Sequence, residues 1–171
     1  MKRTITLLAL AVIVGTAGCG SESETETQTV TEPAEAKGEV APLSKAEYIA
    51  ASDEICGRYE ELAEPLDGRI EDANDDGDYE AAADVIEEAV DLLNQQVDEH
   101  KALAEPVGAD APPPELDEAR TSVVAIFSRL EDALRDEDQE RVDALAAELE
   151  SAEAEIEGID AGYGFQVCGK D

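Results

Sequence analysis

Basic and aromatic residues are scarce in this chain of 171 residues. It has 12 Lys and Arg against 44 Asp and Glu, a formal net charge of −32, and it has no Trp, two Phe and four Tyr. So much negative charge repels phosphate groups, which argues against nucleic acid as a partner and against direct docking on an anionic lipid surface. The shortage of aromatic residues predicts a slim core built from Ala, Val, Leu and Ile, in which a covalent cross-link matters for stability.

The residue patterns of common enzymes are also missing. The sequence has a single histidine, His100, and it contains no CxxC pair, no glycine-rich phosphate loop and no G-x-S-x-G motif. Carboxylates are so dense that any spacing suited to acid–base hydrolysis occurs by chance. His100 falls on an apolar helical stripe, so we interpret it as a core residue, with a pH-sensitive contact as the alternative. We therefore do not expect an enzyme.

The first 19 residues are typical of a lipoprotein export signal. Lys2 and Arg3 precede an apolar run over residues 5–14, which is shorter than the ~20 residues of a membrane-spanning helix. Thr16-Ala17-Gly18-Cys19 resembles the bacterial lipobox, although Thr stands where Leu is usual. We predict a signal peptide over 1–18, lipidation of Cys19 and a location on the extracytoplasmic face of the cell membrane.

A polar segment follows the signal. Residues 20–42 are rich in Ser, Thr and Glu and lack hydrophobic periodicity, so they cannot bury enough apolar surface to become ordered. We expect Cys19 and a disordered acidic linker to occupy 19–43, and a helical domain to occupy 44–171.

Two cysteines remain once Cys19 is lipidated. Cys56 and Cys168 form an even number in an oxidising compartment, and we predict that they pair. Closing so long a loop restricts the unfolded chain by roughly 4–5 kcal/mol on the chain-entropy argument. A redox-active or metal-binding pair is the alternative, and neither the spacing of the cysteines nor a neighbouring histidine supports it.

Apolar residues recur at steps of three and four from Ser44 onward, which predicts four amphipathic helices. Ser44 and Glu47 form a capping box at the start of the first helix, and Pro65 is expected to kink or split that helix near Glu64. Asp78 is the expected N-cap of the second helix. The expected core stripes are Tyr48, Ser52, Ile55, Tyr59, Leu62 and Leu66; Ile86, Val90, Leu93, Val97, His100 and Ala104; Leu116, Ala119, Val123, Phe127, Leu130 and Leu134; and Val142, Leu145, Leu149, Ala152, Ile156 and Ile159.

Short connections between these stripes favour an antiparallel arrangement. A proline-rich link over 106–114 separates the second helix from the third, and a polar run over 135–138 separates the third from the fourth. The glycine-punctuated segment 162–169 can fold back on the domain. The predicted fold is therefore an all-α, antiparallel four-helix bundle.

Two short motifs frame this domain. Ser52-Asp53-Glu54-Ile55-Cys56 and Tyr163-Gly164-Phe165-Gln166-Val167-Cys168-Gly169, together with the segment 77–83, resemble a group of small secreted actinobacterial lipoproteins. In that group an "ADxIC"-like motif and a C-terminal "YGLxxCG"-like motif enclose a helical domain. The resemblance covers most of the domain and implies the helical fold and the Cys56–Cys168 pairing, and it implies no activity.

One segment resembles a calcium-binding loop. Asp72, Asn74 and Asp76 supply oxygens on alternate residues before a glycine, and the carbonyl of Asp78 could add another. The twelfth position is Ala83 instead of a bidentate Glu, so any affinity for calcium should be weak. The alternative is an ordinary interhelical turn rich in Asp, Asn and Gly.

The function these observations favour is a membrane-anchored, non-enzymatic binding module of the cell envelope. Its partners would be the membrane, through the anchor at Cys19, and an envelope protein or a small ligand. The alternative is a lipoprotein that binds calcium weakly or buffers cations. Apart from possible Ca²⁺, no cofactor is expected.

Overall fold

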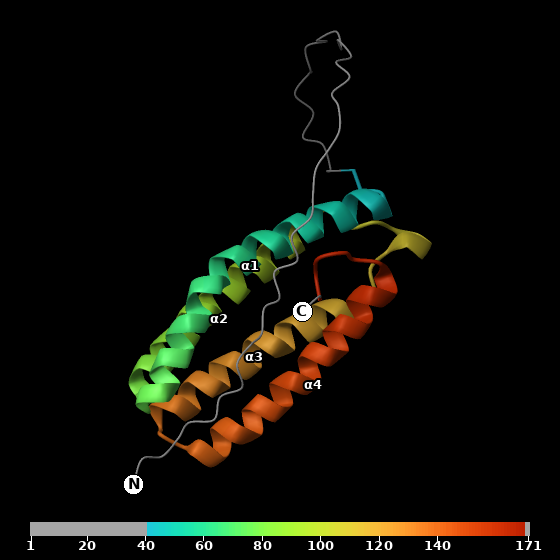
Figure 1. The fold of residues 1–171 in the computed structure, drawn as a ribbon. Helices are drawn as coiled ribbons and strands as arrows, with labels where there is room; N and C mark the ends of the chain where they lie inside the picture. The colour runs from blue at the N-terminus through green and yellow to red at the C-terminus, as the bar shows by residue number, and fades with distance from the viewer. Residues whose placement is uncertain (1–40, 170–171) are drawn as a thin grey trace, which may run out of the picture.

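Four helices make up the part of the chain that the computed structural model describes, residues 41–169. They are α1 (Lys45–Asp76), α2 (Tyr79–Ala102), α3 (Glu115–Arg135) and α4 (Gln139–Tyr163), with a short 3₁₀ helix, η1 (Gly108–Asp110), between α2 and α3. Consecutive helices run in opposite directions (Figure 1). The predicted all-α bundle is confirmed. Cys19, the signal segment and nearly all of the linker lie outside the described residues.

The helices pair in chain order. α1 packs on α2, α2 on α3 and α3 on α4, whereas no backbone contact of that extent joins α1 to α4 within residues 41–169. The segment after α4 links the two outer helices instead, through the disulfide between Cys56 and Cys168. None of the described helices is long and apolar enough to cross a membrane. The fold is thus two helical hairpins joined side by side.

The two hairpin turns are built alike. Gly77 adopts a left-handed φ of 67° after α1, and Asp78 donates its N–H to the carbonyl of Ala73, the hydrogen bond of a Schellman motif. After α3, Glu137 takes the same left-handed conformation with a φ of 53°, and the N–H of Asp138 bonds to the carbonyl of Ala133. Asp78 and Asp138 then cap α2 and α4. The predicted Asp78 cap and the Ser44–Glu47 capping box are confirmed.

Pro65 was expected to kink or split α1, and it does not split the helix. The helix runs through Pro65 as one continuous element to Asp76 (Figure 1). Proline has no N–H to offer the carbonyl of Glu61, but Glu61 and Pro65 are both exposed, so water can hydrate the freed carbonyl.

The core has two parts, one toward each end of the bundle. We call the end with the α1–α2 and α3–α4 turns the turn end, and the opposite end the disulfide end. The larger cluster extends from the turn end to the middle and is mostly aliphatic: Ala73, Ala82, Ala83, Ile86, Val123, Ile126, Phe127, Leu130, Ala133, Leu134, Val142, Leu145 and Leu149. The smaller cluster lies at the disulfide end: Tyr48, Leu116, Tyr163, Phe165 and Cys168.

Most residues of the expected core stripes are buried or partly buried, and Leu62 is an exception. It retains 50% of its exposure. α1 packs extensively only against α2, so the outer side of its apolar stripe is left uncovered. The prediction of Leu62 as a core residue was therefore wrong.

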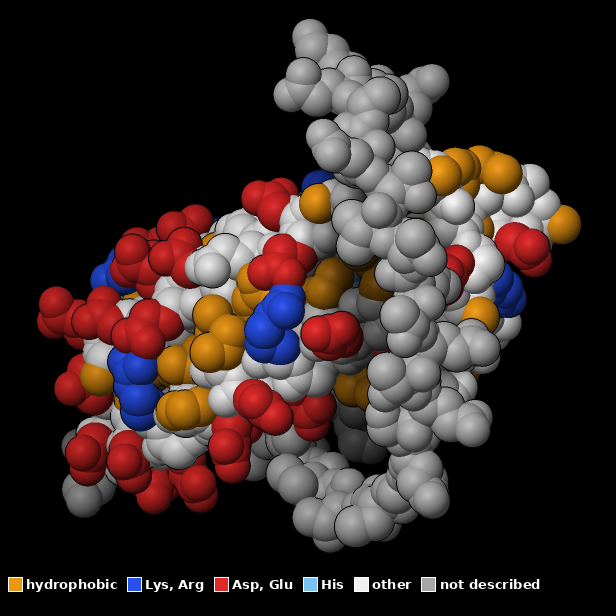
Figure 2. All heavy atoms as spheres, turned by 90° about the horizontal axis from the view of Figure 1, so that it is seen from above, with side chains coloured by type: hydrophobic (Ala, Val, Ile, Leu, Met, Phe, Trp, Pro, Cys, Tyr) orange, Lys and Arg blue, Asp and Glu red, His pale blue; other side chains and the backbone are white. Residues whose placement is uncertain are grey.

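Acidic side chains dominate the described surface seen in Figure 2, with only a few basic groups among them. Four exposed arginines connect neighbouring helices: Arg58 pairs with Glu99, Arg69 with Glu88, Arg129 with Glu148, and Arg135 with Asp84 and Glu87. These pairs are exposed, so each contributes at most about 1 kcal/mol. They fix helix register more than they stabilise the fold.

Candidate ligand cavity beside the disulfide

The C-terminal segment folds back onto α1, as predicted. Cys56 and Cys168 form the expected disulfide, with their Cα atoms 5.3 Å apart. Gly164 ends α4 with a left-handed φ of 110°, which favours glycine, and the next side chain, Phe165, is buried. The chain therefore turns directly from the end of α4 toward α1.

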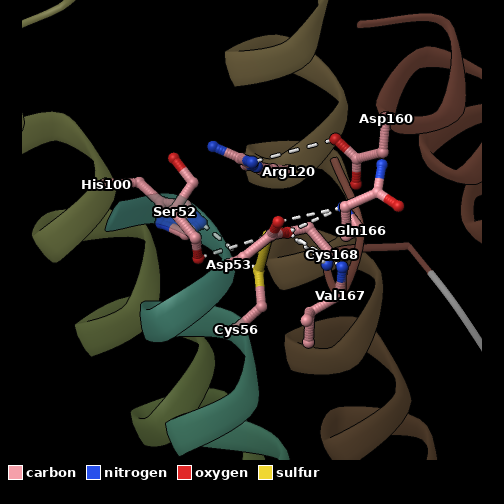
Figure 3. The surroundings of a disulfide bond; sticks show 9 residues. All are labelled: Ser52, Asp53, Cys56, His100, Arg120, Asp160, Gln166, Val167 and Cys168. Atoms are coloured by element: carbon pink, nitrogen blue, oxygen red, sulfur yellow. Dashed lines mark hydrogen bonds and ion pairs between the residues drawn. A yellow bond between two sulfur atoms is a disulfide. The ribbon is translucent and has the colours of Figure 1, made fainter. Parts of the chain in front are cut away.

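Asp53 holds this segment in place. Its carboxylate accepts hydrogen bonds from the N–H groups of Gln166, Val167 and Cys168, at N···O distances between 2.9 and 3.1 Å. Three consecutive amides around one carboxylate form an anion-binding concavity, here filled by the protein itself. Cys168 is thus positioned by hydrogen bonds as well as by its covalent bond (Figure 3).

Three aromatic rings close the disulfide end. The ring centroids of Tyr163 and Phe165 lie 5.1 Å apart, and each lies about 6 Å from the ring of Tyr48 (6.1 and 6.2 Å). The hydroxyl of Tyr163 donates to the carbonyl of Asp110 at 2.6 Å, which ties η1 to α4. The predicted placement of Tyr48 in the core is confirmed.

A cavity of about 170 Å³ lies next to the disulfide. Apolar side chains from three helices form much of its wall: Leu93, Val97, Val123 and Ile156. His100, Arg120 and Asp160 bring ionisable groups to the same wall from α2, α3 and α4. The cavity therefore combines an apolar surface with a compact polar side.

The ionisable groups are poorly paired. Arg120 and Asp160 approach to 3.9 Å between Nη2 and Oδ1, beyond hydrogen-bond distance, although their side chains are only 10% and 2% exposed. Among the described residues, Nη1 and Nη2 of Arg120, Oδ1 of Asp160 and Nδ1 of His100 have no hydrogen-bond partner. In Figure 3 the guanidinium of Arg120 lies between Asp160 on one side and His100 on the other.

Burial shifts the pKa of two of these groups, Asp160 and His100. It raises the pKa of Asp160 to about 6, an effect that the positive charge of Arg120 partly offsets and the negative charge of Asp53 reinforces. Burial, together with the charge of Arg120, lowers the pKa of His100 to about 3. At neutral pH the cavity therefore contains a charged guanidinium, a neutral imidazole and a carboxyl group close to its titration range.

Cys56, His100 and Cys168 form the only group of three possible metal ligands found within residues 41–169. Nε2 of His100 lies 3.6 Å from Sγ of Cys56. The two sulfur atoms are bonded to each other, so neither is available as the thiolate that a metal requires. His100 is buried, with 3% exposure, which confirms its placement in the core.

Gly169 completes the wall. Its φ is 68°, and a Cβ atom there would lie 2.8 Å from Oδ2 of Asp160 and 3.2 Å from the Cα of Glu157. A side chain at this position would push Asp160 and strain the backbone at the same time. The final glycine of the C-terminal motif is thus needed for the close approach of the chain to Asp160.

The residues of the expected calcium-binding loop lie at the end of α1 and at the N-cap of α2. Asp72, Asn74 and Asp76 lie in the last turns of α1, where residues two apart point to different sides of the helix. The carboxylate of Asp78 accepts from the N–H of Ala81 as the cap of α2. This geometry fits the alternative of an interhelical turn, and calcium binding there gains no support.

Arg120 and Asp160 were missed in the sequence, where they look like two more surface charges. A signal was present, because Arg120 follows Leu116 by four residues and precedes Val123 by three. Asp160 stands in the same relation to Ile156 and Tyr163. A charged residue in register with an apolar stripe indicates a buried charge.

A scan against protein-family models, a search of curated proteins and a search of solved structures each found no match to this chain. The resemblance to secreted actinobacterial lipoproteins stays a prediction.

Proposed function

We propose that this protein is a lipid-anchored, extracytoplasmic binding protein that takes a small molecule into the cavity beside its disulfide. One observation carries the proposal. One side of the cavity is lined by ionisable side chains from three helices, His100, Arg120 and Asp160. Each of them has a buried polar atom without a hydrogen-bond partner among the described residues.

Unpartnered polar atoms are costly inside a protein. A buried donor or acceptor without a hydrogen bond costs about 1–3 kcal/mol, and more if it is charged. An ion pair with only a structural role would be expected to close to hydrogen-bond distance, whereas Arg120 and Asp160 stay 3.9 Å apart. A ligand with matching polar groups would remove this cost. Apolar walls with a few convergent polar groups are typical of small-molecule sites.

The proposed location is supported by the two ends of the chain. The lipobox-like residues before Cys19 predict export and anchoring, and the Cys56–Cys168 disulfide suits an oxidising compartment. The acidic linker would hold the domain away from an anionic membrane, which the strongly negative chain should avoid. A binding site within the helical domain would then face the aqueous side of the envelope.

Blocking the cavity tests the binding half of the proposal. Val97→Phe would fill the cavity from α2, and Val90→Phe is the matched control, since Val90 is partly buried two turns earlier on the same helix and does not line the cavity. The disulfide-bonded protein would be screened by thermal shift against a library of small polar molecules. We expect responses that survive in Val90→Phe and disappear in Val97→Phe. Responses that persist in both variants, or none in the unmodified protein, would contradict the proposal.

Intact-mass analysis tests the anchoring half. Protein isolated from its natural host should begin at Cys19 and carry the mass of a diacylglycerol group. A chain that begins at Met1 without added mass would contradict the lipoprotein assignment and leave the binding experiment unaffected.

A further inference from the structure

The chemistry of the cavity narrows the class of ligand. Arg120 supplies its one permanent positive charge, because a guanidinium stays protonated at any physiological pH. Its terminal nitrogens are buried, and neither has a hydrogen-bond partner within the described part of the chain. A planar group with two oxygens would satisfy both nitrogens at once, which is the usual bidentate geometry between arginine and a carboxylate.

The other two ionisable groups limit the ligand's charge. His100 is neutral because burial and the charge of Arg120 lower its pKa to about 3, so it adds hydrogen bonding but no second positive charge. Asp160 is negative when ionised and would repel a multiply charged anion. One positive charge beside one titratable carboxyl group suits a monoanion better than a phosphate dianion. A cationic ligand would be repelled by the positive charge of Arg120.

The remaining wall and the volume limit the ligand's size. Val97, Val123 and Ile156 offer aliphatic surface near the polar groups. The volume of about 170 Å³ is similar to that of a cavity known to hold benzene, about 150 Å³. The ligand should therefore have a short apolar portion of only a few carbon atoms.

We propose that the cavity binds a small organic monocarboxylate, with the carboxylate on the guanidinium of Arg120 and a short apolar tail against Val97 and Val123. The inference rests on the proposed small-molecule binding and specifies its chemistry. His100 completes the polar side as a hydrogen-bond partner. Asp160 sets the pH response, because an ionised Asp160 repels the ligand and a protonated Asp160 can donate a hydrogen bond to it.

Three probes of equal length and different charge test this assignment: butyrate, butyramide and butylamine. Each would be titrated into the disulfide-bonded protein while the methyl NMR signals of Val97, Val123 and Ile156 are followed. We expect saturable shifts with butyrate at millimolar concentrations and binding weaker by about tenfold with butyramide, because a neutral amide loses a charge-assisted hydrogen bond of roughly 1.4 kcal/mol. Butylamine should produce no shifts.

Two arginine variants test whether the carboxylate binds the positive charge of Arg120. Arg120→Gln should weaken butyrate binding by about tenfold or more and leave the weak binding of butyramide nearly unchanged. The control is Arg129→Gln, which removes an exposed arginine from the same helix and should leave butyrate binding unaltered. Val97→Phe keeps Arg120 and should abolish binding of both probes, so the assignment stays testable if Arg120→Gln does not fold.

The outcomes separate the two proposals. Butyramide or butylamine binding as tightly as butyrate would overturn the carboxylate assignment and leave a small-molecule site in place. Equal loss of butyrate binding in Arg120→Gln and Arg129→Gln would also overturn it, because the effect would then come from overall charge. No shifts with any of the three probes would count against both the carboxylate and the cavity as a ligand site.

The pH profile provides a second readout. Asp160 is influenced by Arg120 from α3 and Asp53 from α1, and it shares the cavity wall with His100 from α2. Because the pKa of Asp160 is about 6, butyrate affinity should rise as pH falls from 7.5 to 5.5. Asp160→Asn should flatten this dependence. A profile that is flat in the unmodified protein would contradict the role given to Asp160.

Discussion

The turn end and the disulfide end of the bundle are built on opposite principles. At the turn end, aliphatic side chains fill the core and both hairpins close with Schellman turns and Asp caps. At the disulfide end, aromatic rings, the disulfide and the hydrogen bonds of the Asp53 carboxylate enclose a cavity with ionisable groups on one side. All three buried polar or charged residues that the structure describes, Ser52, His100 and Asp160, belong to the disulfide end.

This difference shows how a small domain can contain a site whose unpaired buried groups make the domain less stable. Unpaired buried groups lower the free energy of unfolding, so the rest of the domain must offset them. Close aliphatic packing does so at the turn end. At the disulfide end the Cys56–Cys168 bond and the hydrogen bonds of Asp53 hold the cavity walls together.

Removal of the disulfide should have the largest effect. The double variant Cys56→Ala and Cys168→Ala should lower the free energy of unfolding by roughly 4–5 kcal/mol, measured by urea denaturation, because the unfolded chain regains its freedom. Hydrogen exchange should rise most in residues 164–169. An equal rise at the turn end would show that the two ends unfold as one unit.

The second test changes the turn end. Leu134 is fully buried, with 0% exposure, so Leu134→Ala should lower the free energy of unfolding by about 3 kcal/mol through lost burial and a residual void. Any ligand response of the cavity should be retained at temperatures where the variant is folded. A variant that unfolds normally and loses the ligand response would show that the two ends are coupled.

Much of the turn end could be predicted from the sequence, because local rules govern it. The Asp78 cap and the aliphatic stripes are set by residues close together in the chain. The disulfide could be predicted because only Cys56 and Cys168 remain once Cys19 is assigned to lipidation. The polar side of the cavity depends on residues from three helices, and no local rule brings Arg120 and Asp160 together. Of the two outcomes expected at Pro65, a kink or a split, the split does not occur, because the carbonyl that proline leaves without a hydrogen bond is exposed to water.

The third test uses acid to affect the disulfide end selectively. The pKa of His100 is lowered to about 3 from an ordinary value near 6.5, so the unfolded chain binds a proton that the folded chain does not as the pH falls below 6.5. This contribution lowers the free energy of unfolding by about 2 kcal/mol between pH 7 and pH 5. His100→Gln should remove that loss, as measured by urea denaturation at both pH values.

Asp160 has the opposite effect on how stability changes with pH, so it needs a variant of its own. Its pKa is raised to about 6, so the folded state binds the extra proton and gains stability as pH falls from about 6 toward 4. Asp160→Asn should therefore increase the acid sensitivity that His100→Gln removes. If His100→Gln has the same pH dependence as the unmodified protein, the imidazole is not buried as described.

The smallest effect is expected at the two hairpin turns. Glu137→Gly should raise the free energy of unfolding by about 0.5–1 kcal/mol, since glycine adopts the left-handed conformation without the steric cost that a side chain incurs. The matched control is Gly77→Ala at the equivalent turn, which should lower it by about 1 kcal/mol. Thermal midpoints of the two variants should move in opposite directions. Movement in the same direction would show that the two turns are not equivalent.

The disulfide has one more consequence, for resistance to cleavage. It makes a closed covalent loop that contains most of α1, all of α2, α3 and α4, and the connection over 103–114. Most of that connection is exposed, with Val107 at 71%, so it is the natural place for a protease to cut. A single cut there would open the loop without releasing either hairpin, because α1 and the end of the chain stay bonded. A nicked protein would then remain one molecule until its disulfide is reduced.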